Sequence, residues 1–216
     1  MQRRAFLLGT SAWLIEASAS ATSARSVTRN ALEPYSEVAP IGEDMRRCIA
    51  FFQFDCPHCR ALHPLLERWG RSLPISVGFE FLPVVTSDRG QIMAARSWYA
   101  VALAAPSRLD AFSDRAYALV QDDRMRMDAG ATWEAAARQA GVSDFALAWV
   151  RVPVDRIRRG VEKLVVYRIQ TTPSLAIAGR YVVTPDATQG DADLFLRLAS
   201  GLLSKSIAQR SSATLP

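Results

Sequence analysis

The sequence predicts an α/β fold in which an all-helical segment separates two groups of strands. Short β-prone runs at 48–54 and 77–85 flank an amphipathic helix that starts at Cys56. Two further short strands follow only after residue 170, and the segment 88–160 before them shows helical periodicity. The chain has 216 residues, of which 50% are hydrophobic and 22% are charged. That is enough to bury one core and to carry a sizeable insertion.

The N-terminal segment 1–24 has the layout of an export signal. Arg3 and Arg4 precede a mostly apolar stretch, Ala5–Ile15, and small residues suited to cleavage follow at 17–21. An uncleaved membrane anchor is the alternative, which the shortness of the apolar stretch disfavours. The arginine pair fits a twin-arginine signal as well as the general export route, and the sequence leaves both open. Either route would place the cysteines in an oxidising compartment.

The remaining chain divides into a sheet-containing domain, an insertion and a tail. We expect 25–87 and 161–205 to form the sheet-containing domain, 88–160 the helical insertion and 206–216 a disordered tail. The lead-in 25–45 is polar, contains two prolines and is expected to be irregular. The apolar face of the first helix has a spacing of three and four, at Cys59, Leu62, Leu66, Trp69 and Leu73. The later helices are expected at 89–105, 107–121, 131–140, 143–150, 154–169 and 191–204, with a hairpin of strands at 174–178 and 181–184.

The formal net charge of +5 does not indicate a nucleic-acid-binding surface. The 26 basic residues are scattered among 21 acidic ones. The densest basic cluster, at Arg156, Arg158 and Arg159, is best interpreted as the solvated face of a helix. We therefore expect no nucleic-acid partner.

The tetrapeptide Cys56-Pro57-His58-Cys59 carries the candidate chemistry. A proline at the first helical position puts Cys56 at the helix N-terminus and Cys59 one turn inside. The free backbone N–H groups and the helix dipole stabilise a thiolate on Cys56, and a protonated His58 can add a charge or a hydrogen bond. A stabilised thiolate favours the reduced form, so the disulfide of this pair would be a good oxidant.

Three other interpretations of the motif are less consistent with the sequence. A static disulfide does not explain the aromatic strand before the motif, the helix after it and the distant Thr-Pro pair that precedes another strand. Zinc could use Cys56, His58, Cys59 and His63, but these lie at one short helix start without a second ligand cluster. An attached haem would require histidine directly after the second cysteine, where Arg60 stands.

At these residues the chain resembles a known family. The segment Phe51–Cys59 (FFQFDCPHC) resembles the active-site segment of the DsbA family, the periplasmic thiol:disulfide interchange proteins of the thioredoxin superfamily. Thr172-Pro173, with the strand pair that follows, resembles the cis-proline loop of that family, and 88–160 resembles its inserted helical domain. The resemblance implies a thioredoxin fold with an inserted all-helical domain. It also implies a thiol-disulfide oxidoreductase of the dithiol-oxidase type.

The resemblance further implies roles, partners and a location. A substrate thiolate would attack Cys56, Cys59 would be the resolving cysteine, and Thr172 and Pro173 would bind the substrate backbone. The Cys56–Cys59 disulfide would be the redox centre, without a metal or an organic cofactor. The partners would be unfolded or folding exported proteins that contain cysteine and a quinone-linked membrane reoxidant of the DsbB type. The protein would act in the periplasm, as a monomer.

Two departures from the family pattern leave alternatives open. Ala50 stands where enterobacterial members carry an acidic residue, and whether Asp55 substitutes for it is undecided. Thr172, before the proline, is common in disulfide isomerases. A periplasmic isomerase or reductase and a redox-silent peptide-binding chaperone of the same fold therefore remain alternatives. The lead-in 25–47 leaves no room for the N-terminal dimerisation domain of periplasmic isomerases, which favours the oxidase.

Three further residues near the motif have simpler expected roles. Cys48 is expected to be a small buried core residue rather than a regulatory thiol. His63 is expected to be a packed or solvated helix residue. Pro64 is expected to kink the helix because it removes the hydrogen bond to the carbonyl one turn earlier.

Overall fold

The computed structural model describes residues 33–213, so the predicted signal at 1–24 lies outside the described residues. A mixed five-stranded sheet is the centre of the described chain, with the strand order β1-β5-β4-β2-β3. Strand β2 pairs in parallel with β3, and the other neighbours are antiparallel. The strands are β1 at Ser36–Glu37, β2 at Arg47–Phe52, β3 at Gly78–Pro83, β4 at Ser174–Ile177 and β5 at Tyr181–Val183.

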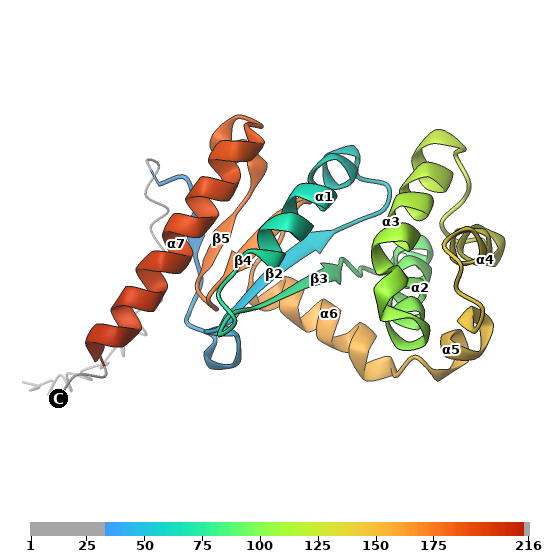
Figure 1. The fold of residues 1–216 in the computed structure, drawn as a ribbon, viewed down its shortest axis with the longest axis horizontal. Coiled ribbons are helices and arrows are strands. Elements are labelled where there is room, and N and C mark those ends of the chain that lie inside the picture. The colour runs from blue at the N-terminus through green and yellow to red at the C-terminus, as the bar shows by residue number, and fades with distance from the viewer. Residues whose placement is uncertain (1–32, 214–216) are drawn as a thin grey trace, which may run out of the picture. The chain divides into compact units, whose positions relative to one another are not determined.

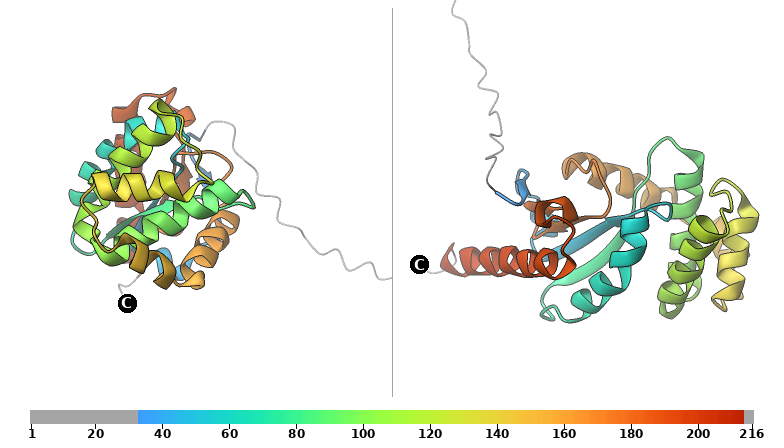
Figure 2. Two further views of the ribbon diagram at one scale, coloured as in Figure 1. Left: turned by 90° about the vertical axis from the view of Figure 1, so that its right-hand side faces the viewer. Right: turned by 90° about the horizontal axis from the view of Figure 1, so that it is seen from above.

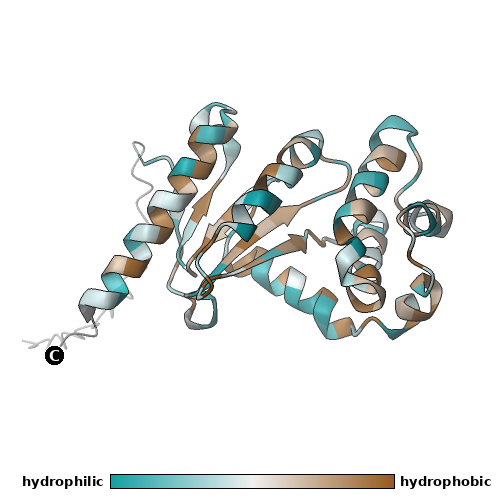
Figure 3. Cartoon of the chain, viewed as in Figure 1, coloured by the Kyte–Doolittle hydropathy of each residue, from teal (hydrophilic) through white to brown (hydrophobic). Residues whose placement is uncertain are grey.

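The side chains of β2 point alternately into two separate hydrophobic cores, one on each face of the sheet. Cys48 and Ala50 face a core that includes helices α1 (Pro57–Arg71) and α7 (Ala192–Ala213). Ile49 and Phe51, at the intervening positions, face a core continuous with the helical insertion. Figures 1 and 2 show α6 on the opposite side of the sheet from α1 and α7. Strand β2 is hence buried on both faces, and Figure 3 shows the central strands as mostly hydrophobic ribbon.

The helical insertion packs its own aromatic core beside the sheet. Phe112 and Trp133 are fully buried there, with ring centroids 6.5 Å apart, and Phe54 from the loop after β2 packs against both rings. The insertion is thereby anchored to the loop that leads into α1. Its helices are α2 at Arg89–Ala104, α3 at Leu109–Tyr117, a π-helical turn at Ala118–Asp122, α4 at Gly130–Gln139, α5 at Phe145–Arg151 and α6 at Val154–Val166.

From β2 onward, the order of strands and helices predicted from the sequence is confirmed, including the hairpin of β4 and β5. Its turn lies one residue earlier than expected, at Ala178 and Gly179, which both have positive φ. A side chain at position 179 would place its Cβ 2.4 Å from the Ile41 carbonyl oxygen, so glycine is required there. None of the helices from residue 33 to residue 213 combines the length and the hydropathy that a membrane span requires.

One expectation for the N-terminal part of the described residues is wrong. The expected irregular lead-in contains β1, which forms because Ser36 and Glu37 pair with the edge of β5. The predicted domain boundary at residue 160 falls inside α6, a continuous helix. The first helix ends at Arg71, where the sequence predicts its end, and its buried face includes His63.

The predicted disordered tail is also wrong for residues 206–213, which continue α7. The Ser206 side chain is buried and donates to the Leu202 carbonyl at 3.0 Å. Arg210 donates to the Met45 carbonyl at 2.7 Å. The burial of Ser206 and the contact of Arg210 with Met45 hold a segment whose own composition is too polar to predict a packed helix.

Candidate active site

The start of α1 places the two cysteines of the motif in different environments. Cys56 is the N-cap residue, with extended backbone (φ −91°, ψ 112°), and Pro57 occupies the first helical turn. The backbone N–H of Cys59 donates to the Cys56 sulfur at 3.2 Å, so the sulfur takes the place of a capping oxygen. Cys56 is half-buried, whereas Cys59 is 2% exposed and belongs to the core. Both are free thiols, and Pro57 and His58 are exposed beside them.

The loop before β4 completes the site from more than a hundred positions away in sequence. Strand β4 pairs with β2, with Ser174 opposite Phe51, so the residues preceding β4 lie at the end of β2 where α1 begins. The Thr172–Pro173 peptide bond is cis. The Cys56 thiol donates to the Thr172 carbonyl at 3.2 Å, and the Thr172 hydroxyl donates to the Gln53 side chain at 3.0 Å. The structure therefore brings Thr172 into direct contact with Cys56.

The surroundings shift the pKa values of the two thiols in opposite directions. The pKa of Cys56 is lowered to about 6, chiefly by a hydrogen bond from the Cys59 side chain. Burial opposes this effect, while Thr172, the Cys59 backbone amide and the charge of His58 add to it. Burial raises the pKa of Cys59 well above its usual range, and the hydrogen bond to Cys56 raises it further. These shifts favour a thiolate on Cys56, the more accessible sulfur, over one on Cys59.

Beneath the cysteines, His63 is part of the packing. It is 4% exposed and stacks on the Phe81 ring, with centroids 3.9 Å apart. Its Nδ1 lies 3.3 Å from the Tyr117 hydroxyl, while its buried Nε2 has no hydrogen-bond partner. Burial lowers the pKa of His63 to about 4. Within residues 33–213, no group of three His, Cys, Asp or Glu side chains is arranged to hold a metal ion.

The other residues near the motif lie apart from the sulfurs. Cys48 is fully buried in β2, and burial raises its pKa to about 12, so this thiol is protonated and inaccessible. Ala50 is buried in the same strand and supplies no charge. Asp55 is exposed. Helix α1 is continuous through Pro64.

Two residues that no sequence pattern indicated contact this region. Gln121, in the π-helical turn, donates to the backbone carbonyls of Phe54 and Cys56 at 2.8 and 3.1 Å. Asp122 forms a bidentate ion pair with Arg60 at 2.7 and 2.8 Å. No local pattern could have indicated them, because they lie more than sixty positions from their partners.

The comparisons with known proteins agree with this geometry. No family model matches the sequence. The chain is 28% identical over 165 residues to the thiol:disulfide interchange protein DsbA of Bordetella parapertussis, a match that covers 73% of this chain and 75% of the Bordetella protein. The protein of the same name from Bordetella bronchiseptica matches to the same extent. By this similarity the chain is a thiol:disulfide interchange protein of the DsbA type.

Solved DsbA structures share its fold. A DsbA variant from Pseudomonas aeruginosa superimposes with a TM-score of 0.70 at 17% identity, covering 82% of this chain and 97% of that one. The oxidoreductase NmDsbA1 from N. meningitidis has a TM-score of 0.70 at 21% identity and covers 83% and 94%. The predicted fold class, an α/β sheet with a helical insertion, is confirmed. The chain is a DsbA-type thiol:disulfide oxidoreductase whose redox-active pair is Cys56 and Cys59.

Proposed function

We propose that this DsbA-type protein is an oxidase that donates the Cys56–Cys59 disulfide to thiols of exported proteins. The difference in acidity between the two sulfurs supports this direction. With a Cys56 pKa of about 6, the thiolate is the stable form of the reduced enzyme at neutral pH. Since stabilising the reduced form makes its disulfide easier to reduce, the oxidised enzyme should be a strong oxidant.

In the first step, a substrate thiolate attacks the Cys56 sulfur of the disulfide. The Cys56–Cys59 bond breaks, a mixed disulfide forms between the substrate and Cys56, and the Cys59 sulfur leaves with the electron pair. Because burial strongly disfavours a charged Cys59, that sulfur takes up a proton. Cys56 is the sulfur that is attacked because it is half-buried while Cys59 is enclosed.

In the second step, another substrate thiolate attacks the substrate sulfur of the mixed disulfide. The substrate disulfide forms and Cys56 leaves as a thiolate, so two electrons have passed from the substrate to the enzyme. A low leaving-group pKa speeds this step. Pro57 contributes by starting the helix at Cys56, and the exposed His58 contributes its charge when protonated.

Substrate binding is assigned to Thr172 and Pro173. These residues lie beside Cys56 at the entry to β4, and Thr172 already meets the Cys56 thiol through its carbonyl. An extended substrate segment could pair with backbone groups at this loop while its cysteine reaches the Cys56 sulfur. The proline has no N–H, which leaves the loop free of one competing donor.

The cellular setting follows from the family and the N-terminal sequence. We propose export to the periplasm by the signal at 1–24, action as a monomer on folding proteins, and reoxidation by a quinone-linked membrane protein of the DsbB type. The division into sheet-containing parts and a helical insertion, with its sequence boundary moved out of α6, is part of the same proposal. No metal or organic cofactor enters either step.

A periplasmic isomerase or reductase is the second candidate, because Thr172 precedes the cis-proline, a position where disulfide isomerases commonly carry threonine. The deciding experiment equilibrates the mature protein in glutathione buffers and quantifies its reduced fraction. The oxidase proposal expects a potential less negative than about −200 mV, while a value near about −270 mV would assign a reductase. Alkylation of Cys56 as a function of pH should give a pKa near 6, and an ordinary thiol pKa would contradict the proposal. Cys48→Ala should leave both values unchanged, because Cys48 is buried away from the motif.

A further inference from the structure

The helical insertion reaches the active site through one irregular turn. At the end of α3 the backbone N–H of Asp123 donates to the Ala118 carbonyl at 3.1 Å, five residues back, which makes Ala118–Asp122 a π-helical turn. Such turns insert one residue into a helix and redirect the side chains that follow, and they are frequent at functional sites. Figure 1 shows α3 beside α1. The side chains presented to α1 by this turn are those of Gln121 and Asp122.

Gln121 contacts the backbone that carries the attacked cysteine. Its half-buried amide donates to the Phe54 carbonyl at 2.8 Å and to the Cys56 carbonyl at 3.1 Å. The Cys56 carbonyl also accepts the first helical hydrogen bond, from the Arg60 N–H at 3.2 Å. One side chain thus fixes the carbonyls of the two residues that flank Asp55, within the loop that sets the start of α1.

The carbonyl of Cys56 matters because its orientation is coupled to the position of its sulfur. The peptide after Cys56 is set by a ψ of 112°, and this angle decides where the first helical turn lies relative to the Cys56 side chain. The Cys59 N–H that stabilises the sulfur, at 3.2 Å, belongs to that turn. A rotation of the Cys56–Pro57 peptide would lengthen this contact and weaken the stabilisation of the thiolate.

The same loop is also held by the cis-proline loop that precedes β4. Thr172 donates from its hydroxyl to the Gln53 side chain at 3.0 Å, and the Cys56 N–H donates to the Gln53 carbonyl at 3.4 Å. The loop Gln53–Cys56 is therefore held between Thr172 and Gln121, which belong to segments far apart in sequence. The exposed ion pair between Asp122 and Arg60 adds little energy, since both side chains are in water.

We propose that Gln121 is a positioning residue for Cys56: its amide holds the Cys56 carbonyl so that the Cys59 N–H stays on the Cys56 sulfur. The helical insertion thereby sets part of the oxidising strength of the motif. The inference rests on the proposed function, since it concerns thiolate stabilisation at Cys56. It assigns to the insertion a contribution to redox chemistry in addition to its packing.

Two substitutions test the inference. Gln121→Leu keeps the approximate size of the side chain and removes both donors, and Gln121→Glu keeps the shape but presents a carboxylate that cannot donate when ionised. Gln139→Leu, at an exposed position on α4, is the matched control. For each protein, the pKa of Cys56 is measured by alkylation, the redox equilibrium with glutathione is determined, and both oxidised and reduced forms are unfolded in urea.

The expected result is a rise of about half a unit to one unit in the Cys56 pKa for Gln121→Leu and a larger rise for Gln121→Glu. The equilibrium with glutathione should then shift about three- to tenfold toward the oxidised enzyme. An unchanged pKa and an unchanged redox equilibrium, with equal loss of stability in both redox forms, would overturn the inference and leave Gln121 a packing contact. If Gln121→Leu fails to fold, the Cys56 pKa and the redox equilibrium of Gln121→Glu decide between the same two outcomes. An ordinary Cys56 pKa in the unmodified protein would instead overturn the proposed function.

Discussion

The Cys56 thiol and the Thr172 carbonyl lie 3.2 Å apart, although 116 positions separate the two residues in sequence. The contact depends on the pairing of β2 with β4, which aligns the end of one strand with the beginning of the other. The hydroxyl of Thr172 in turn reaches Gln53, directly after β2. Thr172 therefore links the cis-proline loop to the loop that carries the motif, and its side chain can be tested separately from its backbone.

Replacing Thr172 with Val should make the enzyme a weaker oxidant. Thr172 lowers the pKa of Cys56 in the folded protein, and valine keeps the branched shape without the hydroxyl. We expect the Cys56 pKa to rise by about half a unit to one unit, less than a full hydrogen bond to a charged group would give, because the hydroxyl also donates to Gln53. Alkylation kinetics across pH 4 to 9 measure this change. Thr171→Val is the control, since Thr171 is exposed and only its carbonyl is engaged, and an equal shift in both variants would contradict the assignment.

The stability of the reduced protein should depend on pH in a way that the oxidised protein does not share. The Cys56 pKa is about 6 when folded and about 9 when unfolded, so between these values the unfolded chain binds the extra proton. The stability of the reduced form should therefore rise from pH 6 toward pH 9, and this contribution should be lost as the pH falls through 6. Urea unfolding of both redox forms between pH 5 and 8.5 measures the difference. A difference that does not vary with pH would refute the prediction.

Burial of His63 should weaken the protein in acid. The folded pKa is about 4 and the ordinary value is 6.5, so the unfolded chain binds a proton that the folded chain excludes. Stability should fall as the pH drops from 6.5 to 4, by up to about 3 kcal/mol from this residue. His63→Phe should flatten that part of the pH profile of the oxidised protein, while His58→Ala, at an exposed position, should retain it. If the stability of the unmodified protein and that of His63→Phe changed with pH in the same way, the prediction would be wrong.

A buried ion pair between Lys163 and Asp44 should be essential for stability. Both side chains are at most 5% exposed, and the Tyr167 hydroxyl donates to the same Asp44 carboxylate at 2.7 Å. Lys163→Met would leave a buried carboxylate without its cation, at a cost of about 3–5 kcal/mol. Urea unfolding should show that adding Asp44→Asn recovers part of this loss, because the two residues are coupled.

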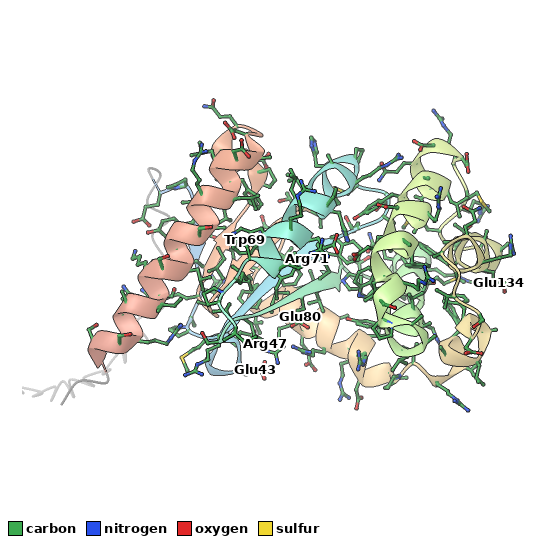
Figure 4. The ribbon with its side chains drawn as sticks, in the orientation of Figure 1. Glu43, Arg47, Trp69, Arg71, Glu80 and Glu134 are labelled. Carbon is green, nitrogen blue, oxygen red and sulfur yellow. The ribbon has the colours of Figure 1, made fainter. Side chains whose placement is uncertain are left out.

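The matched control for that pair is Glu43, the exposed second partner of Lys163. Figure 4 shows Glu43 near Arg47 and Glu80, which form an ion pair of their own. The Glu43 side chain is 72% exposed, so Glu43→Gln should cost less than about 1 kcal/mol. A cost for Glu43→Gln equal to that of Lys163→Met would show that burial does not determine the strength of these pairs.

Local patterns determined the elements and the centre of the chemistry. Proline after Cys56 and the apolar spacing of Cys59, Leu62 and Leu66 predicted α1, and the structure has that helix from Pro57. The β-prone run before the motif predicted β2. These features depend on neighbours within one or two turns, so hydrophobic periodicity and helix capping were sufficient.

Elements with weak local signals were missed for a physical reason. Strand β1 has two residues, too few for any alternating pattern, and forms through its pairing with β5. The segment 206–213 is polar, and its helix is held by the burial of Ser206 and by the contact of Arg210 with the Met45 carbonyl. In both places tertiary contacts outweigh the intrinsic preference of the segment.

The sequence by itself determined that this protein carries two cysteines at a helix start, and hence its class of chemistry. Only the tertiary structure decided how acidic each cysteine is. Burial separates Cys59 from solvent, and strand pairing brings Thr172 to the Cys56 sulfur. A π-helical turn of the insertion places Gln121 on the Cys56 carbonyl. Desolvation and hydrogen bonding depend on groups that are distant in sequence, so no local pattern contains them.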